Sequence, residues 1–342
     1  MKIETSLTVI SLISLALGAP TSNDDVDKLT VTKSLFPDNL VQYTGQHEIV
    51  SLLLPINGLN LEEEETSTGS DSDSNENELQ LTSFFVEADI NSDGNRVDQN
   101  LYVLKQGHAK KLLDHGRDAA ASFDMSKLVF FGAADGIYVY NKENNSADKY
   151  GTVSDSIIGI AKEATGDVIY ILTENHEVYK VSNEGTTKEK INDIVNAKQI
   201  VLDYSNNIYF YSDDKQAYVH SADGVKKIEG LPENPKSVNL IKPPFILDNA
   251  VLFLVDNVVH TIYANGTSKQ LDIEFSPDAV PSAFSPEPFL TQLYAYDKKI
   301  YEYNIFAILF REILHEIRTY VIKATDQIGP VSLKGKILMR NQ

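Results

Sequence analysis

Apolar segments that alternate with polar positions recur six times along the chain. They begin at Leu101, Ile137, Val178, Ala217, Val258 and Ile300. Their markers lie 36, 41, 39, 42 and 41 residues apart, at Tyr102, Tyr138, Tyr179, Tyr218, His260 and Tyr301. Alternation is typical of half-buried β-strands, and a period near 40 residues is typical of propeller blades. The sequence therefore predicts an all-β, six-bladed β-propeller of four-stranded blades over residues 28–304.

Each period begins with small and β-branched residues and continues with aromatic ones. In the second period the strands are predicted at Asp118–Asp124, Lys127–Phe131 and Ile137–Tyr140. The first strand is expected to line the crowded axis, and the aromatic strands are expected to pack between blades. Glycines that follow Asp, Asn or Glu supply the tight hairpin turns, at Gly136, Gly185, Gly224 and Gly266.

The first and last blades are irregular. The innermost strand of blade one is predicted at Glu48–Leu54, before a long acidic insertion. Blade six has no fourth strand after Tyr303, and the unassigned strand Leu29–Lys33 is expected to complete it. Such a closure would cover edges that an open ring exposes.

Both ends of the chain lie outside the repeat. Residues 1–18 have the short apolar run and small residues of a secretory signal peptide, with cleavage predicted near Gly18–Ala19, so we expect a secreted, extracellular protein without stable membrane insertion. Spacings of three and four predict an amphipathic helix over 305–324. The helix either packs on the propeller or mediates self-association or lipid contact. The tail, 325–342, has no assignment.

Composition excludes several classes of function. The chain has no cysteine, which removes disulfides, thiol catalysis and thiolate metal sites. Its net charge of −19 disfavours nucleic acid as a partner. Much of that charge lies in the tract 62–78, for which we expect a disordered loop, with weak calcium binding or serine phosphorylation as alternatives. Two sequons predict glycosylation of Asn144 and Asn265 in exposed turns.

One segment resembles the start of a calcium-binding loop. Asp89, Asn91 and Asp93 alternate before Gly94, but the pattern then places Arg96 beside the would-be ion and Asn100 where a bidentate Glu is needed. The segment is therefore interpreted as an Asn- and Asp-rich hairpin turn.

The axial mouth of the propeller is the predicted ligand site. Its candidate residues stand where the inner strands begin: Arg117, Asp118, Asp155, Asn196, Lys198, Lys236 and Ser282. Arginine and lysine bind carboxylates and aromatic side chains stack on rings, so this set favours a planar, anionic small molecule. The mixture of charges disfavours a dication, so no metal and no cofactor is expected. Axial calcium, as in the six-bladed lactonases, is the alternative.

Parts of the repeat resemble the ommochrome-binding proteins of moth and butterfly haemolymph. The similar phrases run from Asn100 to Ala133, from Gly159 to Glu163 and from Ile300 to Asn304. The resemblance implies a secreted, non-enzymatic carrier of a tryptophan-derived aromatic pigment. A calcium-dependent propeller hydrolase and a structural or interaction protein of secretions or cuticle are the alternatives.

Overall fold

The computed structural model describes residues 29–56, 81–92, 96–124, 126–242, 247–286 and 291–304. The chain divides into two compact units, Met1–Tyr303 and Asn304–Gln342, and the propeller belongs to the first. Four expectations fall outside the described residues: the signal peptide (1–18), the acidic loop (62–78), the amphipathic helix (305–324) and the tail (325–342).

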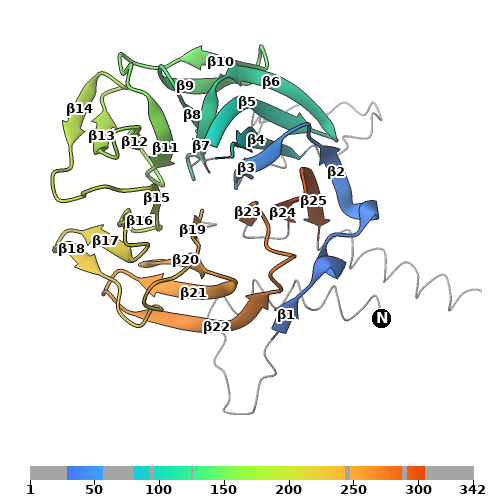
Figure 1. The fold of residues 1–342 in the computed structure, drawn as a ribbon. Coiled ribbons are helices and arrows are strands. Elements are labelled where there is room, and N and C mark those ends of the chain that lie inside the picture. The colour runs from blue at the N-terminus through green and yellow to red at the C-terminus, as the bar shows by residue number, and fades with distance from the viewer. Residues whose placement is uncertain are drawn as a thin grey trace, which may run out of the picture. The chain divides into compact units, whose positions relative to one another are not determined.

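Six sheets surround a central axis, which confirms the predicted all-β, six-bladed propeller (Figure 1). From the axis outward, blade one contains β3 (Glu48–Leu53), β4 (Thr82–Ile90), β5 (Arg96–Lys105) and β6 (His108–Asp114). Blade two contains β7 (Gly116–Ala121), β8 (Val129–Ala133), β9 (Gly136–Asn141) and β10 (Ser146–Lys149). Blade three contains β11 (Ile157–Lys162), β12 (Ile169–Thr173), β13 (Val178–Ser182) and β14 (Thr187–Lys190).

The remaining blades continue the ring. Blade four contains β15 (Gln199–Leu202), β16 (Ile208–Tyr211), β17 (Ala217–Ser221) and β18 (Gly224–Lys227). Blade five contains β19 (Val238–Ile241), β20 (Ala250–Val255), β21 (Val258–Tyr263), β22 (Ser268–Phe275) and a fifth strand, β1 (Leu29–Val31). Blade six contains β23 (Ala283–Pro286), β24 (Thr291–Tyr296), β25 (Lys299–Asn304) and β2 (Val41–Thr44).

The prediction that Leu29–Lys33 completes blade six is wrong. Leu29–Val31 instead runs parallel to β22 at the outer edge of blade five. The strand that completes blade six is β2, which pairs antiparallel with β25 (Figure 1). An N-terminal strand therefore still closes the ring, but it lies about ten residues further along the chain.

Aromatic packing explains why the later segment closes the ring. Between β1 and β2 the chain passes through two short 3-10 turns, η1 (Lys33–Leu35) and η2 (Asp38–Leu40). Phe36 lies between them, and its ring stacks on Tyr296 with centroids 4.3 Å apart and contacts Tyr301 at 5.2 Å. This anchor holds the chain on blade six, and β2 begins beside β25 five residues later, at Val41.

The hydrophobic core consists of layers between neighbouring blades. Phe84 and Val86 of β4 pack on Phe131 and Val129 of β8, and Phe130 packs with Ile169 and Ile171 of β12 in the next layer. Leu52 and Phe85 likewise pack against Leu293 and Ala295 of blade six. Aromatic residues of the second strands thus fill the spaces between blades, as the sequence predicted.

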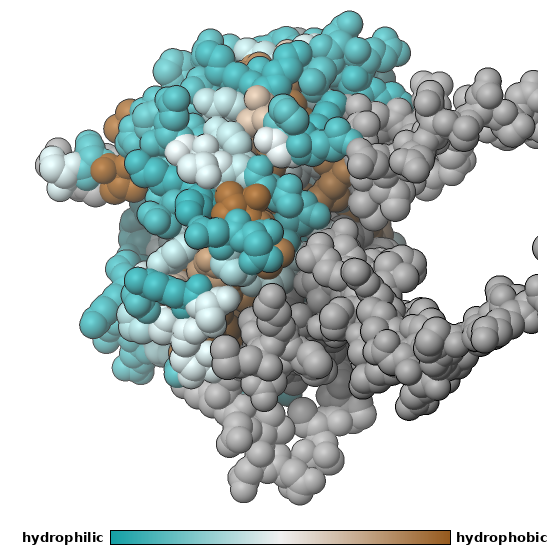
Figure 2. Space-filling view, turned by 90° about the vertical axis from the view of Figure 1, so that its right-hand side faces the viewer, coloured by the Kyte–Doolittle hydropathy of each residue, from teal (hydrophilic) through white to brown (hydrophobic). Residues whose placement is uncertain are grey.

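The predicted turns are confirmed, since Gly136, Gly185, Gly224 and Gly266 all have positive φ. Gly136 also excludes a side chain, because an added Cβ would lie 2.1 Å from the carbonyl oxygen of Val153. Asn144 and Asn265 are exposed in turns. Figure 2 shows the side that lies on the right in Figure 1. Where it is not grey it is mostly hydrophilic, with apolar residues in small separate groups.

Candidate binding site on the propeller axis

A polar cavity of about 220 Å³ opens where the inner strands begin. We call it the mouth cavity. Four of the seven predicted site residues line it: Arg117, Asp118, Lys198 and Ser282. Two aromatic residues, Tyr211 and Phe284, also line it, and the Phe284 ring stacks on Tyr294 with centroids 4.5 Å apart. Burial raises the pKa of Tyr211, so its hydroxyl stays protonated at neutral pH.

Two arginines share one carboxylate beside the mouth cavity. The Nε atoms of Arg117 and Arg96 lie 2.6 and 2.5 Å from the two oxygens of Asp98. Nη1 of Arg117 donates to the Ser156 hydroxyl at 2.7 Å, and Nη2 of Arg96 donates to the carbonyl oxygen of Arg117 at 2.7 Å. Arg117 also pairs with Glu174, whose Oε2 lies 3.7 Å from Nη1. Two carboxylates, Asp98 and Glu174, therefore face the two guanidinium groups.

The sequence reasoning missed Arg96 as a site residue. It begins β5, and the described part of this segment is a β-hairpin in which Ile90 pairs with Arg96. The structure therefore agrees with the hairpin interpretation. The β4 and β5 strands have nine and ten residues, longer than the other second and third strands, and this length brings Arg96 to the mouth cavity. The one available signal was a cation at the tip of an unusually long hairpin.

Asp118 holds inner strands together. Its Oδ1 accepts hydrogen bonds from the Ser51 hydroxyl at 2.8 Å and from Nζ of Lys242 at 2.6 Å. Its Oδ2 accepts the backbone N–H of Ile160 at 2.9 Å. Lys242 also donates to the carbonyl oxygen of Ala119. The carboxylate thus links β3, β7 and β11 to the residue that follows β19, which leaves it little capacity to bind a ligand.

Lys198 is held less tightly. Its Nζ lies 2.8 Å from Asp213 Oδ1, and this hydrogen bond, together with the positive charge, lowers the pKa of Asp213. Asp213 is itself well exposed, so the ion pair lies at the water-facing rim of the cavity. Exposed ion pairs are weak, and a bound anion is able to compete with Asp213 for the ammonium.

The other three predicted residues do not line the mouth cavity. Asp155 pairs with Lys188 of the outermost strand of blade three, at 2.8 Å. Asn196 is exposed, and its carbonyl oxygen accepts the Ser212 hydroxyl. Lys236 is exposed as well, and its backbone N–H donates to Asp256 at 2.7 Å. Position at the start of an inner strand therefore does not ensure that a side chain points to the axis.

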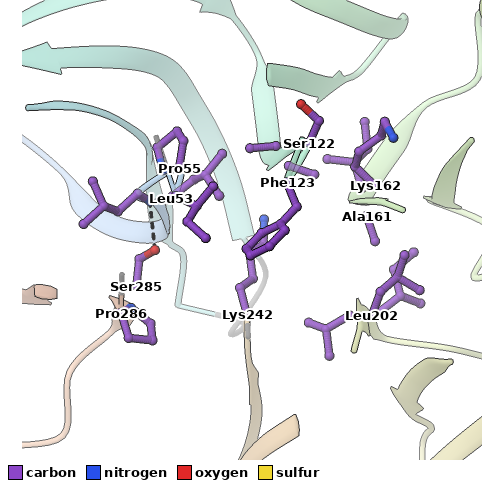
Figure 3. A pocket seen from close by; sticks show the side chains of 17 residues that line it. Leu53, Pro55, Ser122, Phe123, Ala161, Lys162, Leu202, Lys242, Ser285 and Pro286 are labelled. Atoms are coloured by element: carbon purple, nitrogen blue, oxygen red, sulfur yellow. Dashed lines mark hydrogen bonds between the residues drawn. The ribbon is translucent and has the colours of Figure 1, made fainter. Parts of the chain in front are cut away.

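A second cavity, of about 50 Å³, lies on the axis where the inner strands end (Figure 3). We call it the apolar chamber. Leu53, Ala121, Phe123, Leu202 and Pro286 are among the residues that line it. Lys242 lines both cavities, so its ion pair with Asp118 lies between them. No feature of the sequence pattern indicated this chamber.

Metal ligands do not cluster in the part of the chain that the structure describes. No three His, Cys, Asp or Glu side chains gather there in a way that would hold an ion. Among these same residues no helix has the length and apolar character to cross a membrane.

Comparisons with known proteins do not assign a family. No family model and no curated protein sequence matches the chain. A solved structure of a protein of unknown function from Bacteroides thetaiotaomicron is similar, with 10% identity, a TM-score of 0.48, and coverage of 76% of this chain and 70% of that one.

Two further solved structures are similar at the same remote level. PorZ, a surface component of the type-IX secretion system of Porphyromonas gingivalis, has 12% identity, a TM-score of 0.42, and coverage of 65% of this chain and 29% of PorZ. This chain thus spans less than a third of PorZ. YCF48 bound to D1 peptide has 12% identity, a TM-score of 0.42, and coverage of 65% and 74%. Similarities of this size transfer no function.

Proposed function

We propose that this protein is a secreted, non-enzymatic carrier that holds a small aromatic anion in the mouth cavity. One observation carries the proposal. In a chain of net charge −19, four cationic side chains line the mouth cavity, Arg96, Arg117, Lys198 and Lys242, and the one carboxylate in its lining is Asp118. The other carboxylates that pair with these cations, Asp98, Glu174 and Asp213, are not part of the lining. Positive charge collected in an otherwise acidic protein favours an anionic ligand.

The size and walls of the cavity favour an aromatic ligand. A volume of about 220 Å³ has room for on the order of 15 water molecules, so a fused two-ring molecule fits with space left for water. Tyr211 and Phe284 supply surfaces for stacking, and the guanidinium groups supply paired donors for a carboxylate. A tryptophan-derived pigment or metabolite has both features, in line with the resemblance to ommochrome-binding proteins.

Arginine and lysine substitutions test the site. Xanthurenate, a planar tryptophan-derived carboxylate, serves as the probe in calorimetric titration. We expect Arg117→Gln and Lys198→Glu each to weaken its binding by roughly tenfold or more, since hydrogen bonds to charged groups contribute about 1.5–3 kcal/mol. Lys236→Glu is the matched control. It changes the charge as much as Lys198→Glu but lies away from the cavity, so its affinity should stay near that of the wild type.

The same titration separates the carrier from its alternatives. Chelation with EDTA should leave xanthurenate binding unchanged, whereas a calcium-dependent hydrolase would lose activity toward a lactone substrate. If Lys198→Glu and Lys236→Glu lose equal affinity for xanthurenate, only the net charge of the protein matters. That result would refute the mouth cavity as the site. No binding, together with a colourless protein from its natural source, would favour a structural or interaction role.

Secretion, glycosylation at Asn144 and Asn265, and self-association through the helix expected over 305–324 belong to the same proposal. Hydrogen bonds from Thr267 to the Asn265 side chain, at 3.0 and 2.8 Å, support an ordered and exposed acceptor turn at that sequon. Intact mass before and after glycosidase treatment tests both acceptor sites. The N-terminal residue of the exported protein tests the cleavage expected near Gly18–Ala19.

A further inference from the structure

The apolar chamber has a composition unlike that of the mouth cavity. Each of β3, β7, β11, β15 and β23 contributes its last residues, and Lys242 follows β19. Small side chains such as Ala121 and Ala161 leave the space open, while Leu53, Leu202 and Pro286 give it apolar walls. Concave, mostly apolar cavities with few polar groups are the usual form of a small-molecule site.

One ammonium group that lines the chamber, that of Lys242, has a third N–H without an acceptor among the residues that the structure describes. Nζ of Lys242 has three N–H bonds, of which Asp118 and the carbonyl oxygen of Ala119 accept two. Within the described ranges no acceptor is recorded for the third. Lys162, the other lysine in the wall, donates to the carbonyl oxygens of Glu163 and Thr165, and Figure 3 shows its nitrogen directed away from Lys242.

Charge balance decides which ligand this donor takes. Asp118 already neutralises Lys242, and the ammonium of Lys162 is directed away toward the carbonyl oxygens of Glu163 and Thr165. A carboxylate bound near Lys242 would therefore lie beside Asp118 in an apolar space without a counter-charge of its own. A neutral carbonyl or hydroxyl oxygen accepts the third N–H without that cost. The chamber and the mouth cavity therefore differ in the charge of the ligand that they favour.

Size limits the ligand further. A volume of about 50 Å³ holds about four water molecules, or roughly 120 Å³ of liquid. One six-membered ring or a short branched alkyl group fits, and a two-ring pigment does not.

We propose that the apolar chamber is a second ligand site, separate from the mouth cavity, for a small uncharged molecule with one ring or branched alkyl group and one acceptor oxygen. The oxygen accepts the free N–H of Lys242, and the apolar part contacts Leu53, Ala121 and Leu202. This site does not depend on the proposed carrier function, because it uses other residues and a ligand of different charge.

Three probes of the same ring size test the proposal by fluorine NMR on the full chain. They are 4-fluoroacetophenone, which is neutral and has an acceptor, fluorobenzene, which has none, and 4-fluorobenzoate, which is anionic. We expect 4-fluoroacetophenone to bind roughly threefold to tenfold more tightly than fluorobenzene, the range of one net hydrogen bond. The benzoate should be the weakest chamber ligand.

Substitutions then locate the bound probe. Ala121→Leu fills the chamber and should abolish 4-fluoroacetophenone binding, with Leu202→Phe as a second filling variant from another strand if the first does not fold. Lys242→Met should remove the preference for 4-fluoroacetophenone over fluorobenzene. Lys198→Glu, in the mouth cavity, should leave unchanged both the binding of 4-fluoroacetophenone and its preference over fluorobenzene.

Several results would overturn the second site. Binding of 4-fluoroacetophenone that survives a folded filling variant places the probe elsewhere. Loss of 4-fluoroacetophenone binding in Lys198→Glu places the probe in the mouth cavity.

The two proposals can also fail separately. Failure of xanthurenate to bind, with 4-fluoroacetophenone behaving as expected, would refute the carrier proposal and leave the chamber site intact.

Discussion

Two carboxylates are buried inside the blades, where they accept hydrogen bonds from tyrosines. Glu87 accepts the Tyr43 hydroxyl at 3.2 Å, and Asp203 accepts the Tyr209 hydroxyl at 2.9 Å and two donors of Asn207. Burial raises the pKa of both carboxyl groups, because it penalises the charged form more than these hydrogen bonds stabilise it. Both residues thus connect neighbouring segments of the propeller at positions where burial disfavours a charge.

Glu87→Gln tests this effect of burial. A raised pKa in the folded state means that the stability from protonated Glu87 is complete below its ordinary value of 4.5 and is lost as pH rises through the raised pKa. The amide keeps an acceptor for Tyr43 and carries no charge. We therefore expect Glu87→Gln to gain stability relative to the wild type as pH rises from about 5.5 to 8, by on the order of 1 kcal/mol.

Urea unfolding across that pH range measures the difference. Glu177→Gln is the control, because a hydrogen bond from Lys190 lowers the pKa of Glu177 at the surface, so this substitution should bring no gain. A stability difference between Glu87→Gln and wild type that does not change with pH would contradict the account.

At the scale of elements, the closing segment Leu35–Thr44 decides whether blade six has an outer strand. β2 contributes a short pairing, Val41 to Tyr301 and Tyr43 to Ile300. Such a strand gains most of its stability from what anchors it, and Phe36 is the anchor, buried against Tyr294, Tyr296 and Tyr301. Without closure, β25 would become an unprotected edge.

Truncation of the anchor should destabilise the whole ring. We expect Phe36→Ala to lower the free energy of unfolding by about 3–5 kcal/mol, the usual loss for a buried phenylalanine, and Phe36→Leu by about 1.5 kcal/mol or less. Chemical denaturation followed by circular dichroism gives these values. Thr30→Ala, at an exposed position of the extra strand β1, should change stability by no more than about 0.5 kcal/mol. If Thr30→Ala costs as much as Phe36→Ala, then β1 and not β2 secures the ring.

At the scale of the whole molecule, the apolar cores, the cationic cavity and most of the negative charge lie in different parts of the protein. Cores between blades are apolar, the mouth cavity collects cations, and the net charge of −19 resides elsewhere on the chain. A protein of this charge resists association at neutral pH through mutual repulsion. It loses that protection as its carboxylates are protonated.

Solubility should therefore depend strongly on pH. With a sequence pI of about 4.7, we expect a solubility minimum near that pH and free monomers or small oligomers near neutrality. Light scattering from about pH 4 to pH 8 at low and moderate salt checks this expectation. Far-ultraviolet circular dichroism at each pH distinguishes association of folded protein from unfolding. Equal solubility at pH 4.7 and at pH 7 would contradict it.

The local pattern of side chains determined most of the fold. A period of about 40 residues gave the blade number, and alternation with aromatic second strands gave the layers between blades, as Phe84 and Phe130 show. These features follow from contacts within a blade or with the next one, and they repeat along the chain. The turn glycines and the exposed positions of Asn144 and Asn265 were predictable for the same reason.

Tertiary structure decided the closure and the axis. The choice of Val41–Thr44 over Leu29–Lys33, the arrival of Arg96 at the mouth cavity, and the pairing of Asp118 with Lys242 join residues far apart in the chain. Periodicity does not encode such contacts, because it states which face a side chain occupies but not which distant side chain meets it. The inner-strand cations predicted a ligand on the axis, and the resemblance predicted its aromatic character. Only the packed ring showed two cavities there, with Lys242 between them.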